Sequence, residues 1–130
     1  TPALREALPF HTGCRLTDEP VSADFALVTP AALCEAPDFA LGSDEYPDRS
    51  TTLLVALELL DSGDTGSGTW QLSGPGIPAQ RTLRVEERAR PLMLRLAANR
   101  QSFPCGLDAI LTCGERLAAL PRTTRIEEIA

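Results

Sequence analysis

The sequence contains no lysine, so all of its 12 basic residues are arginines. A chain without lysine cannot form its own Schiff base with pyridoxal phosphate or a carbonyl substrate, because that bond needs a lysine amine. It also cannot supply the lysine of a phosphate-binding P-loop. The absence excludes both kinds of site within these 130 residues, and no cofactor is predicted.

Histidine is almost as scarce, with His11 as the single example. A serine hydrolase needs a base beside its nucleophile, and no GxSxG turn presents a serine anywhere in the chain. A metal site needs more ligands than His11 and the nearby Cys14 supply. A structural role for His11 is favoured, and a functional role stays open.

Metal ligands are not grouped elsewhere in the sequence either. The acidic string Asp44, Glu45 and Asp48 lacks the glycine and the ligand spacing of a calcium loop, so a solvated loop is favoured. No CxxC pair occurs, which argues against a zinc site and a disulfide framework. Free buried thiols are therefore expected at the four cysteines, Cys14, Cys34, Cys105 and Cys113.

The charge balance is acidic, with 18 acidic residues against 12 basic ones and a net charge of -6. This balance offers no attraction for nucleic acid or for anionic lipid. No apolar run reaches the roughly 18 to 20 residues of a membrane span, and the N-terminus lacks the layout of a signal peptide. We expect a cytoplasmic protein with neither nucleic-acid nor membrane partners, folded as one domain over residues 1–130.

Hydrophobic patterning predicts strands over much of the chain. Residues 24–28 form a short apolar run typical of a buried strand. Residues 51–60 are apolar on both alternating faces, which predicts a central strand covered on two sides. Residues 70–73 alternate as a half-buried strand does and make a hairpin candidate with 51–60, and residues 81–86 alternate again.

Two segments predict helices. Residues 1–10 have the pattern of a helix end, which Pro9 would terminate because proline lacks the backbone N–H. A second, amphipathic helix begins near Pro91, a residue that the first helical turn tolerates. Its apolar stripe comprises Ala89, Leu92, Met93, Leu96 and Ala97.

Residues 107–113 and 116–120 are apolar runs on either side of Gly114-Glu115, which predicts a hairpin with a two-residue turn. The register that this turn imposes places Cys113 opposite Arg116 and Ile110 opposite Ala119. Together with the strands and helices above, it predicts an α/β domain with a mixed β-sheet flanked by helices.

Continuing this ladder past residue 120 puts Asp108 and Arg122 on opposite sides of the sheet, unless Pro121 introduces a bulge. No salt bridge between them is therefore predicted.

An arginine and two hydroxyl residues follow the second strand of this hairpin: Arg122, Thr123 and Thr124. An arginine fork with hydroxyls can hold a phosphate or phosphonate, or the carboxylate of a partner. The alternative is an ordinary exposed arginine at the sheet edge. A free-standing phosphate- or phosphonate-binding protein or enzyme would use this cluster with His11 and Arg49.

Five stretches, in order, carry a resemblance to a known family: residues 10–14, 23–27, 41–50, 73–77 and 103–124. Through them the chain resembles the PhnH family, whose members belong to the bacterial carbon-phosphorus lyase system for phosphonate breakdown. The five stretches together span most of the chain.

The resemblance implies a fold similar to the large domain of pyridoxal-phosphate-dependent transferases without the cofactor. It also implies a homodimer that associates with the other lyase subunits. Its role would be that of a non-catalytic accessory subunit of the α-D-ribose 1-methylphosphonate 5-triphosphate synthase, with no catalytic residues of its own. Members carry a further N-terminal segment with a helix and a strand, which these residues are expected to lack.

Overall fold

The structure is a computed structural model that describes residues 2–33, 38–63 and 66–129. One of its two sheets is mixed and has the order β1-β2-β6-β7. Its strands β1, β2 and β6 run parallel, and β7 is antiparallel to β6. The bounds are β1 Phe25–Val28, β2 Thr52–Ala56, β6 Asp108–Cys113 and β7 Arg116–Leu120. The predicted α/β fold with a mixed sheet is confirmed.

The second sheet is antiparallel and has the order β3-β5-β4-β8. The predicted hairpin of residues 51–60 with 70–73 is wrong, because β4 pairs with β5 and β8 instead. The long apolar run breaks into β2 and β3, which belong to different sheets. The bounds are β3 Leu60–Asp61, β4 Thr69–Ser73, β5 Arg81–Val85 and β8 Arg125–Glu128.

Six helical segments complete the described fold, and none is long and apolar enough to cross a bilayer. Their bounds are α1 Pro2–Thr12, η1 Pro20–Ser22, α2 Pro30–Leu33, η2 Glu87–Ala89, α3 Arg90–Ala97 and α4 Asn99–Ser102. Pro9 does not end the first helix as predicted, since α1 continues to Thr12. Proline removes one N–H donor, but its carbonyl still accepts a bond from the Gly13 N–H at 2.9 Å.

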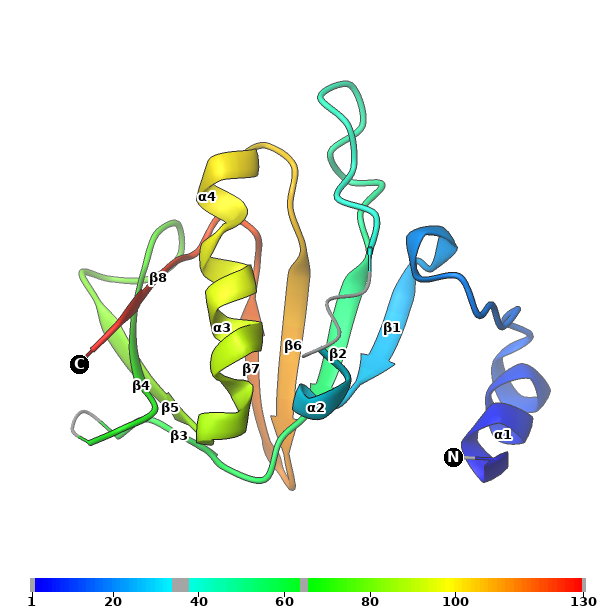
Figure 1. Ribbon diagram of the computed structural model, residues 1–130, viewed down its shortest axis with the longest axis horizontal. Helices are drawn as coiled ribbons and strands as arrows, with labels where there is room; N and C mark the ends of the chain where they lie inside the picture. The colour runs from blue at the N-terminus through cyan, green and yellow to red at the C-terminus, as the bar shows by residue number, and fades with distance from the viewer. Residues whose placement is uncertain (1, 34–37, 64–65, 130) are drawn as a thin grey trace.

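Helix α3 supplies part of the core that the two sheets share. Figure 1 shows α3 and α4 lying between the antiparallel sheet, at the left, and strands β6 and β2 of the mixed sheet. The predicted apolar stripe is confirmed, because Leu92, Met93 and Leu96 are buried on this helix. Both sheets add buried side chains to the same core, for example Val55 and Trp70.

A bidentate ion pair joins α3 to β8 at the edge of this core. Arg90 Nε donates to Glu128 Oε2 at 2.8 Å, and Arg90 Nη2 donates to Oε1 at 3.1 Å. The hydrogen bond from Arg90 lowers the pKa of the Glu128 carboxyl, and the same bond raises the pKa of Arg90. Both side chains are exposed, so the pair contributes little to stability.

The two faces of the mixed sheet differ in how they are covered. Helices α2 and α3 contact each other, and the sheet face toward them is buried, with Leu53 and Leu111 at 0% exposure. The other face carries the apolar row Leu27, Leu54, Ile110 and Ala119, which crosses all four strands.

No described helix covers the row closely enough to bury it: Leu54 and Ile110 are half-buried, and Leu27 is 55% exposed. On the same face, Phe25 is 69% exposed and Leu117 is 66% exposed. The expected burial of β1 is therefore wrong, because β1 is an edge strand with one uncovered face. The expectation that β2 is covered on both sides is likewise only half right, because only one of its faces is buried.

Candidate functional site at the junction of the sheets

The β6–β7 hairpin leads into the site. Its register is as predicted, with Cys113 paired to Arg116 and Ile110 to Ala119. The ladder ends at the pair Ala109–Leu120. The chain then turns, with Thr124 N donating to Pro121 O at 2.9 Å, and enters β8 of the other sheet. Residues 121–124 are thus the connection between the two sheets.

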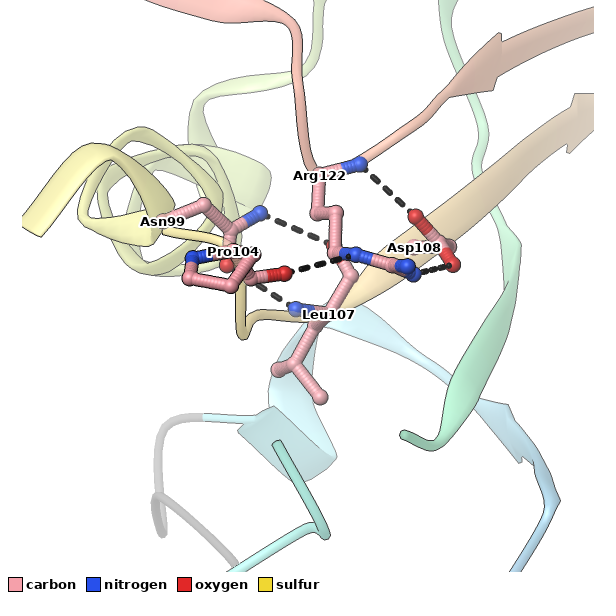
Figure 2. A network of polar contacts seen from close by, with 5 residues as sticks. All are labelled: Asn99, Pro104, Leu107, Asp108 and Arg122. Atoms are coloured by element: carbon pink, nitrogen blue, oxygen red, sulfur yellow. Dashed lines mark hydrogen bonds and ion pairs between the residues drawn. The ribbon is translucent and has the colours of Figure 1, made fainter. Parts of the chain in front are cut away.

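Arg122 anchors this connection to the start of β6. Its backbone N–H donates to Asp108 Oδ1 at 2.7 Å, and its Nη1 forms an ion pair with Asp108 Oδ2 at 2.9 Å. Its Nε donates to Pro104 O at 3.0 Å, as Figure 2 shows. The prediction that Arg122 and Asp108 would not pair is wrong, because it extended the ladder beyond Leu120, where the chain turns.

A buried asparagine braces the same junction from α4. Asn99 Nδ2 donates to Leu107 O at 2.8 Å, and Leu107 N donates to Asn99 Oδ1 at 2.9 Å (Figure 2). The amide thus satisfies both backbone groups of a residue that is itself buried. A Cβ at Gly106, where φ is 153°, would lie 2.6 Å from Asn99 Oδ1, so this close approach needs glycine.

A second glycine brings the β4–β5 turn against the junction. At Gly74, where φ is 128°, a Cβ would lie 3.1 Å from Thr123 O. The Gly74 carbonyl also accepts the N–H of Ile77 at 3.1 Å, which closes the turn after β4. Gly74 therefore serves both as a turn residue and as a point of close backbone approach.

A surface pocket of about 650 Å³ opens where these segments meet. Its polar lining comes from α4, the turn of residues 121–124 and the paired ends of β4 and β8. The exposed ring of Phe103 also borders it. The polar lining side chains include Ser73, Arg100, Arg122, Thr123 and Arg125.

The structure separates the candidate residues predicted from the sequence. Arg122 and Thr123 line the pocket, whereas Thr124 is only 3% exposed. His11 lies on α1, which Figure 1 places at the far end of the molecule from β8. There its ring meets that of Phe10 edge to face, with centroids 5.0 Å apart. The guanidinium of Arg49 stacks on the Tyr46 ring at 3.8 Å.

Two pocket arginines were missed by sequence reasoning. Arg100 is in a four-residue helix, and Arg125 begins a short strand. Neither lies in a recognised motif, so no sequence pattern pointed to them.

The described cysteines and the acidic string were the remaining candidates for a metal site. Among residues 2–33, 38–63 and 66–129, no group of three or more His, Cys, Asp or Glu side chains could hold an ion. Cys14, Cys105 and Cys113 are free thiols, as expected, but Cys14 is exposed and the other two are half-buried. Their predicted burial is therefore wrong, and Cys34 lies outside the described residues.

Comparison with known proteins places this chain in a family. Residues 1–127 match the family described as "Bacterial phosphonate metabolism protein (PhnH)". The chain belongs to the PhnH family. This membership agrees with the resemblance carried by the five sequence stretches.

Two relatives of this PhnH-family chain extend the comparison. It is 39% identical over 133 residues to the α-D-ribose 1-methylphosphonate 5-triphosphate synthase subunit PhnH of Rhizobium meliloti (strain 1021), covering 98% of this chain and 64% of the relative. It is 32% identical over 105 residues to the putative C-P lyase subunit protein HtxG of Stutzerimonas stutzeri, covering 81% of this chain and 51% of that protein. The chain thus spans roughly half to two thirds of their length.

Proposed function

We propose that this chain acts as an accessory subunit of a carbon-phosphorus lyase complex in bacterial phosphonate catabolism. Within that system it would belong to the α-D-ribose 1-methylphosphonate 5-triphosphate synthase and would have no active site of its own. The observation that carries the proposal is the family match over residues 1–127, together with the names of the two relatives. Its partners would be the other subunits of the complex.

The uncovered face of the mixed sheet supports association with another protein. Phe25, Leu27 and Leu117 are each more than half exposed on this face, around a row that crosses four strands. Parallel strands are usually buried on both faces, and exposed apolar patches commonly mark interaction sites. We assign this face to contact with another lyase subunit, since those are the partners that the family match supports.

We further propose that the fold is a version of the large domain of pyridoxal-phosphate-dependent transferases that works without the cofactor. The parallel strands β1, β2 and β6, linked through helices, support this kinship. The lack of lysine supports the absence of a pyridoxal-phosphate Schiff base. A cytoplasmic location and a homodimeric state complete the proposal.

Copurification tests the subunit role. The chain, tagged and coexpressed with the remaining subunits of a carbon-phosphorus lyase system, is expected to retain them on an affinity column. Leu27→Asp and Leu117→Asp should weaken that retention, because they place charges on the uncovered face. Arg88→Asp, an exposed change on η2 outside this face, is the matched control.

Retention of no lyase subunit by the unaltered chain would contradict the proposal. Solution mass measurement on the chain alone separates the possible occupants of the face. If the two aspartate variants turn a dimer into a monomer yet keep the lyase subunits, the face belongs to a second copy instead.

A further inference from the structure

The junction pocket is a basic site on an acidic protein. Arg100, Arg122 and Arg125 all line it, although the chain as a whole carries a net charge of -6. They arrive from three separate elements: α4, the connection between the sheets, and β8. Their meeting is therefore a product of the tertiary fold.

The three guanidinium groups differ in what they already bind. Arg122 is neutralised by the Asp108 carboxylate and fixed by the Pro104 carbonyl. The guanidinium groups of Arg100 and Arg125 make no hydrogen bond or ion pair with the described part of the chain. Neither of these two guanidinium groups is therefore paired with a carboxylate of the described residues, whereas Arg122 is already paired with Asp108.

The remaining lining offers both hydroxyl groups and an apolar surface. Ser73 and Thr123, whose side chains carry hydroxyls, also line the pocket, and Arg125 pairs with Ser73 across the two strand ends. Phe103, which follows α4, is 65% exposed and borders the same space. An aromatic face beside arginines suits a ligand that has an anionic group and an organic ring.

We propose that this pocket binds a phosphorylated small molecule, with its phosphate groups on Arg100 and Arg125 and its organic part against Phe103. Guanidinium groups match phosphate oxygens in geometry and charge, and the hydroxyls of Ser73 and Thr123 add donors. Arg122 holds the connection in place and so positions Thr123 and Arg125. Ligand binding here goes beyond the proposed subunit role and does not depend on it.

The size of the site favours a small ligand over an acidic peptide. Its volume of about 650 Å³ falls within the range of roughly 300 to 1,000 Å³ that is usual for small-molecule pockets. A peptide of acidic residues would instead need a row of basic side chains along an extended surface. Here Arg100, Arg122 and Arg125 line a single pocket.

Calorimetric titration of the purified chain tests the proposal with three probes: ATP, pyrophosphate and adenosine. ATP is expected to bind most tightly, pyrophosphate more weakly because it cannot use Phe103, and adenosine not measurably. Arg100→Ala and Arg125→Ala should each weaken ATP binding roughly tenfold, as expected for the loss of a charge-assisted contact. Phe103→Ala should weaken ATP binding but leave pyrophosphate binding unchanged.

Arg88→Ala is the matched control, because this exposed arginine lies on η2 and does not line the pocket. Thermal unfolding of each variant verifies that it folds. The proposal is overturned if neither phosphate probe binds, or if Arg100→Ala and Arg125→Ala bind ATP as the unaltered chain does. It is also overturned if a hexaglutamate peptide binds as tightly as ATP.

These measurements separate the pocket from the subunit role. Copurification of the Arg100→Ala and Arg125→Ala variants with lyase subunits should proceed as for the unaltered chain. A chain that copurifies but binds no phosphate probe would reject the pocket alone. A chain that binds ATP through the two arginines but retains no subunit would reject the subunit role alone.

Discussion

The junction around Arg122 and the N-terminal segment around His11 differ in how firmly the rest of the chain holds them. At the junction, Arg122 bonds to Asp108 and Pro104, and Asn99 braces the backbone of Leu107. Helix α1, which carries His11, has no buried residue. Its ion pair, Arg5 with Asp18, joins side chains that are 61% and 90% exposed.

This contrast teaches that residue type alone does not mark a site. A histidine and an arginine are equally plausible candidates in sequence, but only the arginine is surrounded by contacts from distant segments. Substitutions in the two regions should therefore differ in how much they lower the free energy of unfolding, with the largest loss at the junction.

Gly106→Ala should cause the largest loss, about 3 kcal/mol, because it combines backbone strain with a clash that displaces the Asn99 amide from Leu107. Urea denaturation of the purified chain measures it. Gly114→Ala is the matched control: its φ of 58° is also positive, but an added Cβ would meet nothing within 4 Å. Equal losses in the two variants would contradict a special role for the Asn99 brace.

Asp108→Ala should lower the free energy of unfolding by about 1 to 2 kcal/mol, since it leaves the half-buried Arg122 without its carboxylate. Arg122→Ala should cost a similar amount. In a double-mutant cycle the two losses should not add fully, because both changes remove the ion pair between Arg122 Nη1 and Asp108 Oδ2. Fully additive losses would show that the ion pair does not couple the two residues.

Glu128→Gln should have a smaller, pH-dependent effect. The pKa of Glu128 is lowered in the folded chain by its hydrogen bond from Arg90, so the stabilisation is fully present above the ordinary carboxyl pKa. It is lost as the pH falls through the lowered, folded-state pKa. The stability difference between the unaltered chain and the variant should therefore shrink as the pH falls below the ordinary carboxyl pKa of about 4.3.

Glu115→Gln, an exposed change in the hairpin turn, provides the comparison for this titration. It should give no such pH-dependent difference. If the stability difference between the unaltered chain and Glu128→Gln stays constant as the pH is lowered, the ion pair does not contribute to stability.

His11→Ala should have the smallest effect, with no measurable change in the denaturation midpoint, because His11 is exposed and its ring partner Phe10 is 84% exposed. The same variant should bind ATP as the unaltered chain does. A loss as large as that of Asp108→Ala would mean that His11 makes a structural contact not seen among the described residues.

Local patterns predicted much of the fold, for identifiable reasons. The Gly114-Glu115 turn set the hairpin register because a two-residue loop leaves only one way to pair the flanking strands. The apolar stripe of α3 could be predicted because an amphipathic helix packs its apolar face against the core. The strand with which Leu60 pairs could not be predicted, since a short apolar strand fits either sheet equally well.

The candidate site was predicted only in part. Arg122 and Thr123 were found because they follow a recognisable strand end. Arg100 and Arg125 were not predicted, because they lie on different elements, α4 and β8, whose relative positions the sequence does not reveal. The pairing of Arg122 with Asp108 depended on a turn after Leu120 that the ladder alone did not reveal.

The sequence by itself determined the family, the α/β character, the main hairpin and helix, and that these 130 residues supply no lysine. These follow from motifs, periodicity and composition, which act over short distances along the chain. The tertiary structure alone decided that the chain forms two sheets, that Arg122 is held by Asp108, and that three arginines converge on one pocket. Such outcomes depend on contacts between residues far apart in sequence, and no local pattern encodes those contacts.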